Sequence, residues 1–238
     1  MATAPTVALT PTLVPPPAPT SAASLDLSTP TDTSPALPAP VPSEAIIRAD
    51  DRITGSGQTV LSIRRPTVTL NRVQSGIGVL LFEAACSAQV GDVRLGCAYE
   101  LRSGPTSTVQ LAGGERFGPA QSRRPVVVAS HERFDRVALD LRQCQDVARL
   151  VIYAFSEGRR PLTWGGTLIV TTFGGAHIEL PLEELGNAEV AVLMSVYNVA
   201  GEFVLRAEME PIAGAIREAC RTYGFDRISW LDDRTPVD

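Results

Sequence analysis

Residues 189–224 read EVAVLMSVYNVAGEFVLRAEMEPIAGAIREACRTYG, and this stretch decides the fold. Two runs rich in β-branched and apolar residues meet at Ala200-Gly201, where a tight turn is expected, so they predict a β-hairpin. Small apolar residues then recur at helical spacing between Pro211 and Gly224. Proline favours the first turn of a helix, and glycine favours the position just past its end. The stretch therefore predicts two antiparallel strands followed by an amphipathic helix over residues 211–224.

Short runs of the same strand-forming character precede the hairpin, separated by turns rich in Gly, Pro, Ser and Asp. These runs are TVLSIRR (59–65), TVTLNRV (67–73), IGVLLFEAAC (77–86), VRLGCAYELRS (93–103), TSTVQLA (106–112), VVVAS (126–130), RVALDL (136–141), RLVIYAFS (149–156), GTLIVTTF (166–173) and HIELPL (177–182). Short strands at such regular spacing are typical of an all-β sandwich. We therefore predict a mainly β fold, a two-sheet β-sandwich with one C-terminal amphipathic helix. The run LEEL (182–185) is compatible with a further single-turn helix.

The first 45 residues differ from the rest of the chain and hold eleven of its nineteen prolines. Such a segment buries too little apolar surface to offset its ordering entropy, so we predict that it is disordered. It is interpreted either as a linker or solvated tail, or as a docking peptide for a protein partner. In the second case Leu25, Asp26 and Leu27 form its small apolar anchor. The predicted organisation is a Pro/Ala/Thr-rich tail over residues 1–45, a sandwich domain over 46–230 and a C-terminal tail over 231–238, expected to fray.

Composition argues against several classes of function. The 238 residues are 44% hydrophobic and carry a net charge of −5, which offers no electrostatic attraction for nucleic acid or anionic lipid. All 21 basic residues are arginines, so no catalytic lysine or phosphate-loop lysine is possible. The four cysteines form no C-x-x-C pair. The sequence shows no secretion signal and no run long enough to span a membrane, so we expect a cytoplasmic, bacterial-type protein.

The C-terminal hairpin and helix resemble the last third of the tellurium-resistance TerD family. The matching runs are LVIYAF (150–155), GTLIVTTFGGAHIELPLEEL (166–185), AVLMSVYNVAGEFVLRA (191–207) and IAGAIREACRTYG (212–224), and TVTLNR (67–72), GVLLFEAACSA (78–88) and ALDL (138–141) follow the family order upstream. The resemblance covers roughly residues 55–225 and is spread over many positions rather than concentrated in one motif. It implies a β-sandwich with a C-terminal helix, calcium-binding acidic loops, a role in bacterial stress response and tellurite resistance, and no enzymatic activity.

The sequence departs from the family at the first acidic loop. This loop corresponds to GDVRLGCAYELRSG (91–104), where Asp92 stands for the first acid but Arg94 and Gly96 occupy the next two acid positions. Calcium takes six to eight oxygen ligands, several of them anionic. A guanidinium beside the ion would repel it by about 4 kcal/mol per unit charge at about 4 Å near a surface. We therefore interpret the loop as a dismantled ion site.

The second acidic loop corresponds loosely to QSRRPVVVASHERFD (121–135) and is also altered. It retains Glu132 and Asp135, but arginines interrupt it, including Arg133. One or two acids cannot offset the repulsion from neighbouring guanidinium groups. Calcium is therefore possible but not expected as a cofactor, and no other cofactor is indicated.

A more specific hypothesis concerns what replaces the ion. Arg94 or Arg133 would place a fixed positive charge where calcium would sit, paired with Asp92, Asp135 or Glu132. Such a pair can hold two loops together, because a guanidinium bonds a carboxylate through two parallel hydrogen bonds. The alternative is that these arginines are exposed and have no particular role, since surface ion pairs contribute little.

Other chemistry has little support in the sequence. His131 and His177 stand in no metal-binding motif, and the contiguous Ser130-His131-Glu132 would point to alternate faces of a strand. Without a convergent acid, base and nucleophile, we predict a non-enzymatic TerD-like protein that acts through protein–protein contact. Two alternatives stay open: a calcium-binding family member with a rearranged site, and an assembly or structural component docked through its Pro-rich tail.

Overall fold

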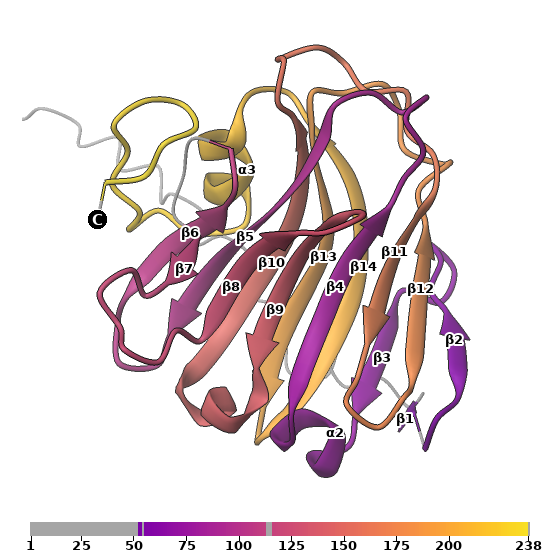
Figure 1. The fold of residues 1–238 in the computed structure, drawn as a ribbon, viewed down its shortest axis with the longest axis vertical. Helices are drawn as coiled ribbons and strands as arrows, with labels where there is room; N and C mark the ends of the chain where they lie inside the picture. Colours follow the sequence, from indigo (N-terminus) through magenta and orange to yellow (C-terminus); the bar gives the residue numbers. More distant parts are fainter. Residues whose placement is uncertain (1–51, 54, 113–115, 238) are drawn as a thin grey trace, which may run out of the picture. The chain divides into compact units, whose positions relative to one another are not determined.

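The computed structural model describes residues 52–53, 55–112 and 116–237. The Pro-rich tail, with Leu25, Asp26 and Leu27, lies outside the described residues, so its disorder and its docking role stay predictions. The described chain is mainly β, as predicted, with two seven-stranded sheets and a short helix after the last strand (Figure 1). Within these residues, no helix combines the length and the apolar character needed to cross a membrane.

The two sheets are called sheet A and sheet B. Sheet A contains, in spatial order, β1 (Arg52–Ile53), β3 (Thr67–Leu70), β14 (Glu202–Ile212), β13 (Val190–Val199), β10 (Val147–Ser156), β5 (Val93–Leu101) and β6 (Thr106–Gln110). Sheet B contains β2 (Gln58–Val60), β12 (His177–Pro181), β11 (Thr167–Thr171), β4 (Val79–Ala85), β9 (Asp135–Asp140), β8 (Val127–His131) and β7 (Phe117–Gly118). The helices are α2 (Arg72–Gly76), the 3-10 helix η1 (Leu141–Asp146) and α3 (Ile216–Thr222).

The C-terminal hairpin is confirmed, but its helix begins later than predicted. Strands β13 and β14 turn at Ala200 and Gly201, which both adopt positive φ angles, 52° and 85°. Strand β14 then continues through Pro211, and α3 begins only at Ile216. Strand β3 pairs with β14 only at residues 204–206, so β14 has no partner on its β3 side at Pro211. Proline, which lacks an N–H, is therefore tolerated on that side of the strand.

Local capping changes two further predicted elements. Strand β3 ends at Leu70, because Asn71 caps α2: the Gln74 backbone N–H donates to Asn71 Oδ1 at 2.9 Å. The predicted strand over residues 67–73 is therefore wrong after residue 70. The run 182–185 forms a turn, in which the Leu185 N–H donates to the Leu182 carbonyl oxygen at 3.2 Å, and not a helix.

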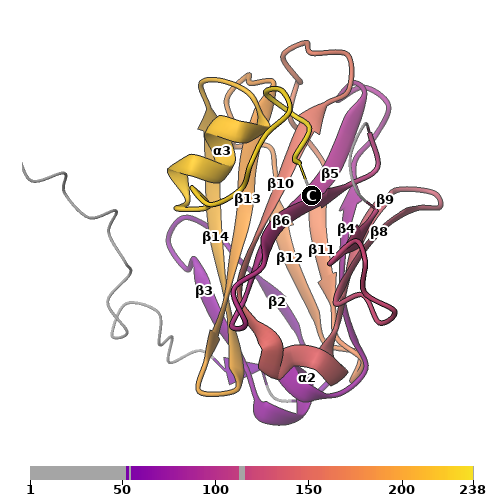
Figure 2. The ribbon, with the colours of Figure 1, turned by 90° about the vertical axis from the view of Figure 1, so that its left-hand side faces the viewer.

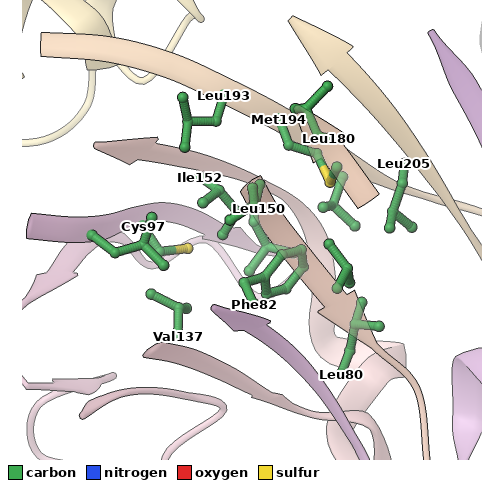
Figure 3. Packing of buried hydrophobic residues seen from close by; sticks show 14 of the residues in the cluster. Leu80, Phe82, Cys97, Val137, Leu150, Ile152, Leu180, Leu193, Met194 and Leu205 are labelled. Carbon is green, nitrogen blue, oxygen red and sulfur yellow. The ribbon is translucent and has the colours of Figure 1, made fainter. Parts of the chain in front are cut away.

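The main core lies between the two sheets. Figure 3 shows Phe82 of β4 and Leu150 of β10 pointing toward one another across this interior. Both side chains are fully buried, and each such burial stabilises the fold by about 1.5–3 kcal/mol. Period-two alternation on β4 and β9 supplies the sheet B side of this core.

A second core covers the outer face of sheet A. Helix α3 lies on this side of sheet A (Figure 2). Its Ile216, Ala219 and Cys220 belong to one buried cluster with Tyr153 and Phe155 of β10. Strands β10 and β13 are consequently buried on both faces over most of their length. This accounts for their nearly continuous apolar sequence, which is unusual for a strand with one wet face.

The C-terminal segment, which we expected to be frayed, folds back onto sheet A. The Arg234 guanidinium donates to the Ser156 carbonyl oxygen at 2.9 Å and pairs with Glu189, and it lies over the Phe155 ring at 5.6 Å from the centroid. Gln110 Nε2 donates to the Arg234 carbonyl oxygen at 2.9 Å. The segment is therefore held largely by Arg234, which is mostly buried and whose partners lie far away in the sequence. Asp233 adds an ion pair with Arg159.

The outer face of sheet B has a different environment. Outward positions of β4, β8, β9 and β11 are half-buried or exposed, while the inward positions between them are buried. Figure 2 shows α3 beside β13 and β14, on the side of the sandwich away from β4, β8 and β9. Among the described residues, no helix covers this face.

Candidate functional site

Arg94 forms an ionic cluster at the end of the sandwich where β5 begins. Its Nη1 lies 3.3 Å from Asp135 Oδ1, while Nε and Nη2 donate to Glu157 Oε2 at 2.9 and 2.7 Å. The hydrogen bond to Glu157 is the main cause that raises the pKa of Arg94. Arg94 belongs to sheet A and Asp135 to sheet B, so one guanidinium joins the two sheets at this end.

Asp135 is the buried partner in this cluster, with 5% of its surface exposed. Its Oδ2 accepts a hydrogen bond from the Leu95 N–H at 3.1 Å. Strand β6 ends at Gln110, opposite Gly96, so beyond that point β5 keeps β10 on one side but has no strand on its β6 side. A buried N–H needs an acceptor, and the Asp135 carboxylate supplies it. Asp135 therefore both closes the sheet edge and neutralises Arg94.

His131 is the third group on Asp135. It ends β8, lies opposite Asp135 in the β8–β9 ladder, and places its Nδ1 2.5 Å from Asp135 Oδ1. The hydrogen bond orients an imidazole that is half-exposed beside a surface hollow of about 580 Å³. Arg94 and Glu157 line the same hollow. The charged groups at this end are thus bonded to one another, while one edge of the cluster faces solvent.

Asp92, the first candidate ligand, has other partners. It accepts hydrogen bonds from Ser156 Oγ at 2.7 Å and from the Gly158 N–H. The bond from Ser156 is the main cause that lowers the pKa of Asp92. Asp92 therefore holds the turn that follows β10.

Glu132 and Arg133, in the β8–β9 connection, also have other partners. Glu132 is 70% exposed and pairs with Arg136, which in turn pairs with Glu83 on β4. The Arg133 guanidinium lies over the Phe134 ring, 5.2 Å from its centroid. Of the residues proposed from the sequence, the structure thus brings together Arg94 and Asp135.

Gly96 lies inside strand β5 and not in a loop. It pairs with Tyr153 of β10, and a Cβ atom at position 96 would lie 2.4 Å from Tyr153 Cε2. The Tyr153 ring is fully buried, and its hydroxyl donates to Gln110 Oε1 at 2.7 Å. The space beside residue 96, which the resemblance aligned with the third acid, is therefore filled here by an aromatic ring.

These residues do not fit a calcium ion. Both Asp135 oxygens already accept hydrogen bonds, and the Arg94 charge lies 3.3 Å from one of them. Calcium needs several anionic oxygens free of a competing cation. In the described ranges, no group of three or more His, Cys, Asp or Glu side chains is arranged to hold a metal ion.

Sequence reasoning missed two members of the cluster. His131 meets Asp135 because the β8–β9 turn places these residues opposite one another, a register that alternation alone does not define. Glu157 is 63 residues from Arg94 and reaches it only because β10 pairs with β5. In the sequence, the only feature that could have pointed to Glu157 was its position directly after the apolar run that forms β10.

Comparison with known proteins adds little to this description. No family model matches the sequence, and no curated protein matches it. Solved structures that match include the protein of unknown function SAV2460, at 12% sequence identity, over 58% of this chain and 94% of that chain, with a TM-score of 0.40. A likeness this distant carries no argument about function.

Proposed function

We propose that this protein is a non-enzymatic interaction domain of the TerD type, which serves a bacterial stress response by binding a protein partner. Support comes from the sandwich with its C-terminal helix, which is the fold that the resemblance implies. The Arg94–Asp135 pair supports the further idea that a guanidinium takes the place of calcium. The ionic groups of the cluster bond to one another, as expected for a structural role.

The observation that carries the proposal is the open outer face of sheet B. Strand register aligns four apolar side chains in one row across this face: Leu81, Ala138, Val128 and Phe117. Phe117 is 49% exposed, and the other three are half-buried. A contiguous apolar row on an uncovered sheet is the usual mark of a protein-binding surface.

Leu81→Arg should remove this contact while the domain stays folded, because Leu81 points away from the core. We expect the amount of cross-linked partner in lysates of the cells that make the protein to fall about tenfold, since a desolvated charge in an interface core costs at least 1.4 kcal/mol. Ile63→Arg, at a 68% exposed loop position, is the matched control and should keep the partner. Equal partner recovery with both variants would contradict the proposal.

Arg94→Asp tests whether the guanidinium replaces an ion. In calcium-free buffer the thermal midpoint should fall, because the new carboxylate would lie beside Asp135 and Glu157. Adding about 5 mM calcium should restore part of the loss, since the three carboxylates then form an oxygen site. Scanning fluorimetry with and without chelator measures both effects.

The control is Arg94→Gln, which removes the charge without adding a carboxylate. This variant should also lose stability but should show no response to calcium. If Arg94→Asp were equally unresponsive to calcium, the replacement idea would be wrong, and the pair would be an ordinary structural contact.

A further inference from the structure

A second feature of the sheet B face lies where β4 begins and β9 ends. A surface hollow of about 640 Å³ is present there, and its floor contains the apolar side chains of Val79, Val128 and Ala138. These residues adjoin the row of Leu81 and Phe117, because Ala138 and Val128 belong to both. The hollow is therefore a continuation of the proposed contact face.

The rim of this hollow is positively charged. Arg123, Arg124 and Arg142 line it together with a single carboxylate, Asp140, which leaves a local net charge of +2 in a chain whose net charge is −5. We call the hollow and these residues the arginine groove. Its sign is opposite to that of the protein as a whole.

Only one of the three guanidinium groups is neutralised within the groove. Arg142 binds both oxygens of Asp140, at 2.8 and 2.9 Å, and Gln143 Nε2 donates to the same carboxylate at 3.1 Å. The bond from Arg142 is the main cause that lowers the pKa of Asp140, so this carboxylate stays ionised. Arg123 and Arg124 form no ion pair with any residue that the structure describes.

The segment that carries Arg123 and Arg124 is held in place by hydrogen bonds. Ser122 Oγ donates to the Arg124 carbonyl oxygen at 2.8 Å and accepts from the Arg124 N–H at 3.1 Å. The Val126 N–H donates to Gly118, and the Asp140 N–H donates to Val126, which ties the segment to β7 and β9. Two adjacent arginines are thus presented at the rim by a fixed backbone, which reduces the entropy lost on binding.

We propose that the arginine groove binds an acidic segment of the partner protein, in which carboxylates alternate with apolar side chains. This inference rests on the proposed function and names the chemistry of the partner. Guanidinium groups bind carboxylates in bidentate geometry, and the apolar floor takes the side chains between them. A peptide fits better than a small anion, because the hollow is partly open to solvent and continues into the apolar row, whereas small-ligand sites enclose their ligand.

The test uses the whole chain and a fluorescein-labelled peptide of about twelve residues in which glutamates alternate with leucines. Fluorescence anisotropy at low salt should give a Kd in the range of about 10–100 μM, and raising the salt should weaken binding. Arg123→Glu/Arg124→Glu should weaken binding at least about tenfold, because both carboxylate contacts become repulsive. Both side chains are exposed, so the fold should not change.

The matched control is Arg64→Glu/Arg221→Glu. It makes the same change in net charge at two exposed arginines outside the groove, and binding should stay within about twofold of the unmodified chain. A peptide with lysines in place of glutamates should not bind. Equal weakening by both double variants, or no binding at about 1 mM protein, would overturn the proposal.

Two other occupants give distinguishable results. If millimolar inorganic phosphate displaced the peptide completely, the site would be an anion site and the peptide proposal would be wrong. If the chain self-associated in sedimentation equilibrium, and only the groove variant abolished it, the occupant would be a second copy. If the partner were lost with Leu81→Arg but kept with Arg123→Glu/Arg124→Glu, the proposal that the outer face of sheet B binds a partner would stand. Only the proposal that the arginine groove binds an acidic segment would be wrong.

Discussion

Replacing Gly96 by aspartate, the residue type that the TerD resemblance would place there, is expected to destabilise the protein by about 5 kcal/mol. The new Cβ would lie 2.4 Å from Tyr153 Cε2, so either β5 or the buried ring must move. The carboxylate would also enter an apolar layer that contains Ala98, Val151 and Phe155. This loss is comparable with the whole stability of many domains, so we expect little folded protein.

Gly186→Asp is the matched control for this substitution. Gly186 is exposed, and a Cβ atom there would meet nothing within 4 Å. Chemical denaturation should show a change below about 0.5 kcal/mol for this variant. A Gly96→Asp protein as stable as the Gly186→Asp protein would mean that Tyr153 does not fill the position, and that an acid at residue 96 is compatible with the fold.

Asp135→Ala is expected to lower the free energy of unfolding by about 3 kcal/mol. Removing this carboxylate leaves the Leu95 N–H without its acceptor and takes one partner each from Arg94 and His131. The loss is large because Asp135 is buried and closes the edge of β5 beyond the end of β6. Urea denaturation followed by tryptophan fluorescence measures it.

Glu132→Ala provides the comparison, because it removes the other acid of the same loop. Glu132 is 70% exposed and pairs with a single arginine, so its loss should cost less than about 1 kcal/mol. If the two variants were equally stable, the Arg94–Asp135 pair would be as unimportant as a surface contact. The interpretation of this cluster as the structural substitute for an ion site would then be wrong.

Much of the fold could be predicted because hydrophobic patterning determines it. The ten predicted upstream strand runs each overlap a strand of the structure, although the run 59–65 is a strand only as far as residue 60. The hairpin turn at Ala200-Gly201 is where the sequence placed it. Alternation was informative for β4 and β9, which have one buried face. Strands β10 and β13 were equally clear because α3 and sheet B bury both of their faces.

The errors arose where local chemistry or long-range contacts override the pattern. Asn71 caps a helix inside what alternation presents as one strand. Pro211 looks like a helix start, but it lies in the part of β14 that no longer pairs with β3. Arg234 holds the C-terminal segment by donating to a backbone carbonyl oxygen. Every residue has a carbonyl group, so the sequence does not indicate which residue accepts this hydrogen bond.

The candidate site was partly predictable. Arg94 and Asp135 were among the proposed partners, because the resemblance placed them in the two acidic loops and their charges are complementary. The role of Gly96 could not be anticipated, because the need for glycine comes from Tyr153 on the neighbouring strand, whose register was unknown. The arginine groove was likewise hidden, since Arg123 and Arg142 meet only when β8 and β9 lie side by side.

The most direct test of the central claim, that an arginine–carboxylate pair replaces the ion, is a calorimetric titration of the whole chain with calcium. We predict no binding heat up to about 1 mM calcium, because Arg94 occupies the carboxylate that an ion would need. Micromolar binding that is lost in Asp92→Ala or Asp135→Asn would contradict the account. The protein would then be a calcium-binding member with a rearranged site.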